Sequence, residues 1–89
     1  MNTEKVTKNV VAEIKTTLES IARSDDTIEP SLIANLSAAL DRPINELDLY
    51  QIYRLHNDLR EAFKKSPNRW HNLDRLIMLD TLLNILTGI

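Results

Sequence analysis

The chain has 89 residues, 43% of them hydrophobic and 27% charged, which suits one folded domain, residues 1–89, rather than a disordered segment. Without cysteine and with two histidines, it has neither a disulfide framework nor the ligands of a thiolate or all-histidine zinc site, and we expect no cofactor. A single glycine excludes a glycine-rich phosphate loop and a set of tight β-hairpins. The composition therefore predicts an all-α protein.

The net charge of −2 is distributed unevenly along the chain. Residues 1–50 hold five Lys and Arg against nine Asp and Glu, a balance of −4, whereas residues 51–89 hold six against four, a balance of +2. Because binding to nucleic acid or to an anionic membrane depends on neutralising phosphates with excess cations, we expect neither partner. The polar start of the chain lacks the pattern of a secretory signal, which predicts a cytoplasmic protein.

Apolar residues at helical spacing predict the first two helices. The first, at about residues 3–24 with Thr3 as its N-cap, has an apolar stripe at steps of three and four residues: Val11, Ile14, Leu18 and Ile21. The second, at about residues 30–41, is short and opens at Pro30, which suits the first turn of a helix because its missing N–H would be unpaired there.

The third and fourth helices are predicted at about residues 45–65 and 67–87. Asn45 is the expected N-cap of the third, followed by Glu46 and Asp48 in a first turn that favours anions. Pro67 is expected in the first turn of the fourth. Since neither a linker nor an internal repeat divides the sequence, it predicts a small antiparallel bundle of four helices with a short helix 2.

The segment from Leu73 onward is apolar on more sides than one helical stripe can hold, although charged residues interrupt it and it is too short to span a membrane. Three neighbouring helices, one of them short, leave part of its surface apolar. We therefore expect a second copy of the chain to cover it. The predicted dimer interface comprises Met78, Leu82, Ile85 and Ile89.

A basic cluster around the only tryptophan follows the third helix. No carboxylate occurs from Lys64 to Leu73, and Arg and Trp are enriched where proteins bind one another. The cluster therefore predicts a partner-binding site, formed by Lys64, Lys65, Arg69, Trp70, His71 and Arg75. Alternatively, Trp70 covers the end of the bundle and the lysines neutralise the C-terminal dipole of the third helix.

Three further features each allow a functional and a structural interpretation. His56 occupies an apolar position of the third helix, which suits either a pH-sensitive switch or a boundary residue with one bonded nitrogen. Asp25, Asp26 and Glu29 share one loop, where capping and turn formation explain them better than a bound cation. Tyr50 lies one helical turn before Arg54, and the two side chains can stack at an exposed patch or at the core edge.

No nucleophile–base pair or metal-ligand spacing accompanies these residues, so we expect no enzymatic activity. The favoured function is a small regulatory or adaptor protein that binds proteins through helix faces as a homodimer, in the manner of regulators, immunity-type inhibitors or chaperones. The alternative is a helix-turn-helix DNA-binding regulator, in which residues 30–40 and the third helix flank a tight turn. Glu46 and Asp48 at the start of that recognition helix count against it.

Overall fold

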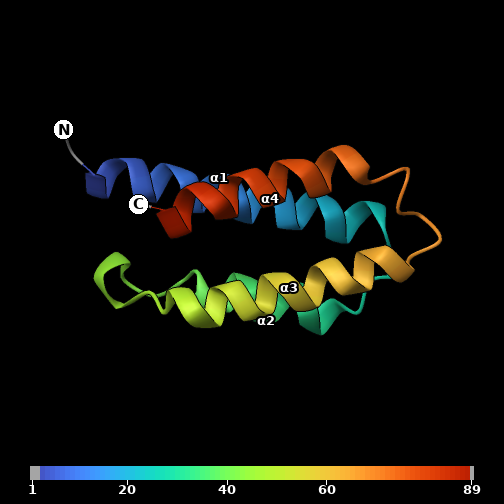
Figure 1. Ribbon diagram of the computed structural model, residues 1–89, viewed down its shortest axis with the longest axis horizontal. Coiled ribbons are helices and arrows are strands. Elements are labelled where there is room, and N and C mark those ends of the chain that lie inside the picture. The colour runs from blue at the N-terminus through green and yellow to red at the C-terminus, as the bar shows by residue number, and fades with distance from the viewer. Residues whose placement is uncertain (1–2, 89) are drawn as a thin grey trace.

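The computed structural model describes the backbone of residues 3–88 and the side chains of residues 5–88, and within this range every regular element is helical. The elements are α1 (Thr3–Ser24), α2 (Pro30–Ala39), the short 3-10 helix η1 (Ile44–Glu46), α3 (Leu49–Lys65) and α4 (Leu73–Gly88). In two layers, α1 lies beside α4 and α2 beside α3 (Figure 1). The predicted all-α bundle with a short second helix is confirmed.

One apolar core joins the two layers. The α1–α2 and α3–α4 connections lie at one end of the bundle, and the α2–α3 connection lies at the other (Figure 1). Each long helix turns one stripe of side chains inward, because apolar residues three and four positions apart share a helix face. The fully buried apolar side chains come from all four α-helices: Ile14, Leu18, Ile21, Leu36, Ile52, Leu59, Phe63, Leu79 and Leu83.

The start of α3 differs from the prediction. Asn45 is not its N-cap, since it lies inside η1, and the helix begins at Leu49. Asp48 is the N-cap, and its carboxylate accepts the backbone N–H of Gln51 at 3.0 Å. The chain turns in η1 and then runs extended at Leu47, whose side chain packs against the core. Burial of Leu47 in this extended conformation separates η1 from α3.

The segment between α3 and α4 also differs, because residues 67–72 form turns rather than the predicted first turns of a helix. Ser66 Oγ accepts the backbone N–H of Asn68 at 3.0 Å, and the side chains of Asn68 and Asn72 bind the α1–α2 loop. Such side-chain bonds compete with the helical backbone bonds. The helix therefore begins at Leu73, and the carbonyl of Asn72 accepts the N–H of Leu76.

The connection between α2 and α3 does not have the geometry of a helix-turn-helix. α2 ends at Ala39, and residues 40–48, which include η1, separate it from Leu49. A helix-turn-helix joins its two helices through a tight turn of about three or four residues. The geometry required by the DNA-binding alternative is therefore missing. Across residues 3–88, moreover, no helix has the length and apolar character needed to cross a membrane.

Candidate functional site

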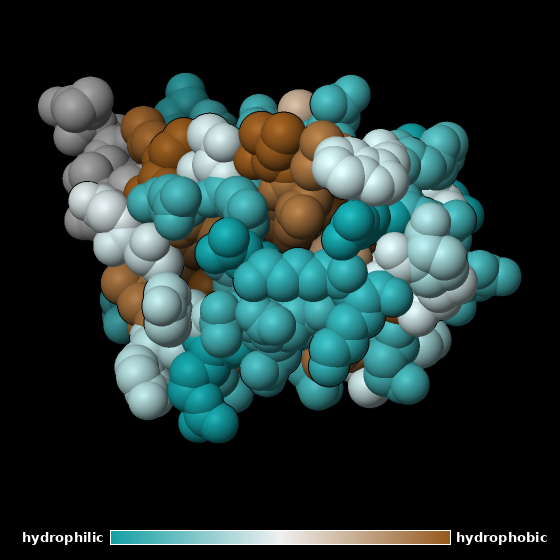
Figure 2. All heavy atoms as spheres, turned by 45° about the vertical axis from the view of Figure 1, so that its right-hand side comes forward, coloured by the Kyte–Doolittle hydropathy of each residue, from teal (hydrophilic) through white to brown (hydrophobic). Residues whose placement is uncertain are grey.

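The outer side of α4 presents large, exposed apolar side chains, interspersed with the exposed polar residues Asp74, Thr81 and Asn84. Leu79, Leu83 and Leu86 are buried on its inner side, whereas four large apolar side chains are 36–57% exposed on the outer side: Leu73, Ile77, Met78 and Ile85. We call these four residues the α4 face. Figure 2 shows apolar surface on the upper layer, which holds α1 and α4, above a broad hydrophilic area. The prediction that part of this helix surface stays apolar within one chain is confirmed.

The predicted dimer interface only partly coincides with the α4 face. Met78 and Ile85 belong to it, but Leu82 is 8% exposed and packs in the core of its own chain. Leu82 is therefore not an open contact residue as predicted. It lies four residues from Met78 on a neighbouring helical row, which sequence spacing alone did not separate from the outer side. Ile89 lies outside the described residues.

The tryptophan of the predicted partner site is open to solvent. Trp70 is 72% exposed, so it does not cover the end of the core. The guanidinium of Arg69 lies over its ring, 5.0 Å from the ring centroid, within the range of a cation–π contact. Lys64 lines the same hollow as Trp70, and Lys65 and His71, close to them in sequence, are also exposed. These five residues form a basic, aromatic corner at one end of the bundle.

Arg75, in contrast, points away from this corner. Its Nε donates to Ser20 Oγ on α1 at 2.9 Å, and its Nη1 donates to the side-chain oxygen of Asn72 at 3.1 Å. The residue therefore links α4 to α1. These bonds hold the guanidinium against α1 and Asn72, so we leave Arg75 out of the corner.

Asp25 is a buried carboxylate in the α1–α2 loop, at the end of the bundle where α3 is followed by α4. It is 1% exposed and accepts five hydrogen bonds. The donors are the backbone N–H and hydroxyl of Thr27, the hydroxyl of Ser66 at 2.9 Å, and the amides of Asn68 and Asn72 at 3.2 Å each. Asp25 therefore joins the α1–α2 loop to the α3–α4 segment, and the structural interpretation of this loop carboxylate is supported.

The spacing of the core stripes places these polar groups together. Three helices each bury a stripe of residues spaced three and four positions apart. At the same end of the bundle, each stripe ends in a polar residue instead of an apolar one. The stripes are Ile14–Leu18–Ile21–Asp25, Ile52–His56–Leu59–Phe63–Ser66 and Asn72–Leu76–Leu79–Leu83–Leu86. We call Asp25, Ser66 and Asn72 the polar end layer. The sequence analysis did not predict this layer, although extending the spacing of the apolar residues by one more step leads to its three members.

The hydrogen bonds to Asp25 determine its ionisation. Burial of the carboxyl group by itself raises its pKa, whereas the side chains of Thr27, Asn68 and Ser66 and the backbone N–H of Thr27 donate to it and lower the pKa. The donors prevail, and the pKa falls from 3.8 to about 2. Asp25 is therefore negatively charged in the folded chain near neutral pH.

Acid is expected to remove the stability that Asp25 contributes. Because the pKa is about 2 in the folded chain and 3.8 is the ordinary value, the contribution is present above pH 4 and is lost as the pH falls toward 2. Its size is about 2 kcal/mol. Urea unfolding at low and neutral pH is expected to show a larger acid loss for the wild type and for Asp26→Asn than for Asp25→Asn. Equal losses in all three proteins would assign the acid sensitivity to other groups.

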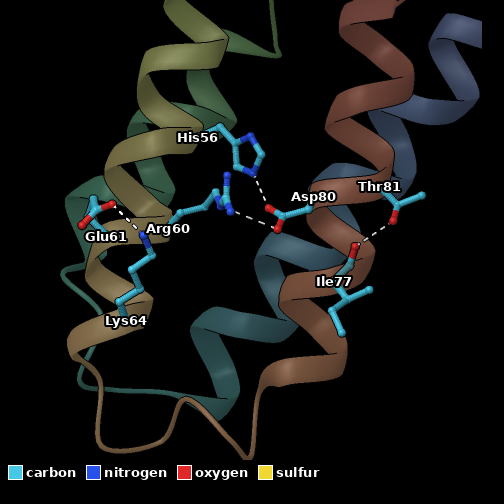
Figure 3. Close-up of polar contacts among 7 residues, drawn as sticks. All are labelled: His56, Arg60, Glu61, Lys64, Ile77, Asp80 and Thr81. Carbon is cyan, nitrogen blue, oxygen red and sulfur yellow. Dashed lines mark hydrogen bonds and ion pairs between the residues drawn. The ribbon is translucent and has the colours of Figure 1, made fainter.

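His56 joins α3 to α4 through Asp80. His56 is 7% exposed, and its Nε2 lies 2.5 Å from Oδ1 of Asp80, while Nε of Arg60 lies 3.7 Å from the other carboxylate oxygen (Figure 3). The imidazole therefore has the single bonded nitrogen expected of a boundary residue. Its contact with Asp80 links α3 to α4.

The remaining candidate residues lie on exposed surface. Tyr50 is 71% exposed, and the guanidinium of Arg54 lies 6.0 Å from its ring centroid, at the outer limit of a cation–π contact. Asp26 and Glu29 are exposed and do not share the bonds of Asp25. Among residues 5–88, no group of three or more histidines and carboxylates is arranged to hold a metal ion.

Comparisons of the chain with models of known protein families, with curated proteins and with solved structures found no match. The α4 face and the basic, aromatic corner are thus the features from which a function is inferred.

Proposed function

We propose that this chain is a small regulatory or adaptor protein that acts by binding proteins through its helix surfaces, with a second copy of itself on the α4 face. The observation that carries the proposal is the exposure of Leu73, Ile77, Met78 and Ile85 along one side of a single helix. The proposed role is binding rather than catalysis, and the proposed location is the cytoplasm.

The apolar character of the α4 face supports association. Burying apolar surface contributes about 25 cal/mol per Å² removed from water, and a rigid helix loses little conformational entropy when it docks. Ile77 and Ile85 lie eight residues apart, about 2.2 helical turns, so they project about 80° apart on the outer half of the helix. In a dimer with a twofold axis, the α4 face of one copy would pack against the α4 face of the other, as in an isologous interface.

Self-association is tested by introducing charge into the α4 face. We expect the wild type to be a dimer at micromolar concentration in size-exclusion chromatography with light scattering. Because a carboxylate loses its hydration when it is buried in an apolar interface, the double substitution Ile77→Glu and Ile85→Glu is expected to weaken association by about a hundredfold or more. Circular dichroism should show unchanged helix content, since both side chains are exposed in one chain.

A matched control places the same charge elsewhere. Tyr50→Glu introduces a carboxylate at a 71% exposed aromatic residue on α3 and is expected to leave the dimer intact. A wild type that remains monomeric at high micromolar concentration would contradict self-association. A dimer that survives the double substitution would place the interface on another surface.

A further inference from the structure

The corner contains a groove of the size of a side chain. It lies where α3 ends and α4 begins, and it is lined by Phe63, Lys64, Arg69, Trp70, Leu73 and Leu76. Its volume of about 230 Å³ is below the roughly 300–1,000 Å³ of pockets that enclose a small-molecule ligand. Such a hollow suits one or two apolar side chains of a docked segment.

The walls of the groove differ from its rim in polarity. Phe63 is 1% exposed and lies deepest, whereas Leu73 and Trp70 are 36% and 72% exposed. Lys64 and Arg69, both exposed, also line the groove, so an apolar side chain inserted here would lie close to two cations. An apolar hollow bordered by charge orients a partner as well as holding it.

The charge around the groove favours an acidic partner. Residues 64–73 contain Lys64, Lys65 and Arg69 but no carboxylate. Within the side chains that the structure describes, Lys65 and Arg69 form no ion pair. Lys64 pairs with Glu61 at 3.1 Å, but both side chains are more than half exposed (Figure 3). Such a surface pair is weak, and a partner carboxylate can replace it at small cost.

A second copy does not fit this groove as well as it fits the α4 face. A twofold contact through the corner would place Lys64 and Arg69 of one copy near the same residues of the other, and like charges oppose such a contact. The groove and the α4 face share Leu73, so the two surfaces are continuous. A second copy on the α4 face would therefore cover Leu73, and the part of the groove lined by Phe63, Lys64, Arg69 and Trp70 remains for a different occupant.

We infer that the groove docks an acidic segment of a partner protein, with an apolar side chain between Phe63 and Trp70. Flanking carboxylates of that segment bind Lys64 and Arg69. The inference rests on the proposed function, because it identifies the chemical class of the partner that such a binding protein recognises.

Trp70 provides a direct test because it is the only tryptophan and lines the groove. The probe is a synthetic helical peptide with leucines on one face and flanking glutamates, compared with versions that carry glutamine or lysine in place of glutamate. We expect the glutamate peptide to shift the Trp70 emission to shorter wavelength. Because exposed charge contacts are individually weak, the glutamate peptide is expected to bind about tenfold more tightly than the glutamine peptide.

Variants assign this preference to the rim. Lys64→Gln combined with Arg69→Gln is expected to abolish the preference for glutamate, whereas Arg42→Gln, in the connection between α2 and α3, is expected to retain it. Anisotropy of a labelled peptide gives a second readout, because loss of Arg69 alters the surroundings of Trp70 directly. High salt should reduce the glutamate preference as well.

Three outcomes would overturn the inference. Equal binding of the glutamate and glutamine peptides would show a groove that selects for apolar shape alone. A mixed-sequence DNA duplex that shifts Trp70 emission at comparable concentration would indicate phosphate recognition instead. If none of the peptides binds while the wild type still dimerises, the partner assignment fails and the proposed self-association stands. If the glutamate peptide binds a strictly monomeric chain, self-association fails and the inference about the groove stands.

Discussion

Replacing Asp25 with alanine is expected to destabilise the chain by about 3 kcal/mol or more, because the substitution removes one acceptor and leaves several buried donors unpaired. The hydroxyl of Ser66 and the amide of Asn72 would lose a partner at 2.9 and 3.2 Å in the polar end layer. For a domain of this size, the melting temperature should fall by roughly 12–24 °C. Thermal unfolding followed by circular dichroism measures this change.

The neighbouring carboxylate provides a matched control. Asp26 is exposed, so Asp26→Ala is expected to change stability by no more than about 0.5 kcal/mol. Both substitutions remove one negative charge from the same loop, and any difference between them reports the hydrogen bonds of Asp25. Similar losses from the two variants would contradict the role assigned to the polar end layer.

Truncation of Leu79 is expected to have the second large effect. Its side chain is 0% exposed in the core, and a Leu→Ala substitution at such a site leaves a cavity that costs about 3 kcal/mol. Ile77 lies two positions earlier on the outer side of α4 and is 54% exposed. At a protein concentration low enough to keep the chain monomeric, Ile77→Ala should change stability by about 0.5 kcal/mol or less.

This pair of substitutions tests the orientation of α4. Urea unfolding gives the free energy of each variant, and the slope with denaturant checks that both unfold in one step. A larger loss from Ile77→Ala than from Leu79→Ala would mean that α4 presents its other side to the core. The α4 face would then be internal, and the proposed mode of association would lose its basis.

The sequence was sufficient to predict the helices from their periodicity. The apolar residues of α1 repeat without interruption, and its bounds agree with the predicted range of about 3–24. Thr3, however, lies inside the helix rather than at its N-cap as predicted. The predicted starts of α3 and α4, at about residues 45 and 67, were wrong, because the observed starts depend on tertiary contacts. Leu47 packs against the core between η1 and α3, while Asn72 binds Asp25 of the α1–α2 loop. Propensity and capping patterns contain no information on such distant partners.

The candidate site was predictable in composition but not in orientation. The cluster of cations around Trp70 was visible in the sequence, and the choice between a covered and an exposed tryptophan required the fold. The burial of Leu82 and the bonds of Arg75 to Ser20 and Asn72 depend on how α4 packs against its neighbours, which helical spacing alone does not give. Asp25 was seen as a loop carboxylate, and its continuation of the Ile14–Leu18–Ile21 stripe distinguishes it from Asp26.

The bonds of Asp25 also bear on how the corner meets a partner. Arg69, Trp70 and His71 lie between Asn68 and Asn72, and both asparagine amides donate to the same buried carboxylate. The short segment that contains Trp70 is thus hydrogen-bonded at both ends to the α1–α2 loop. Because this loop is already ordered, a ligand that binds there loses little conformational entropy in ordering it. The rate at which the ligand dissociates should therefore depend on the contacts formed rather than on folding of the loop.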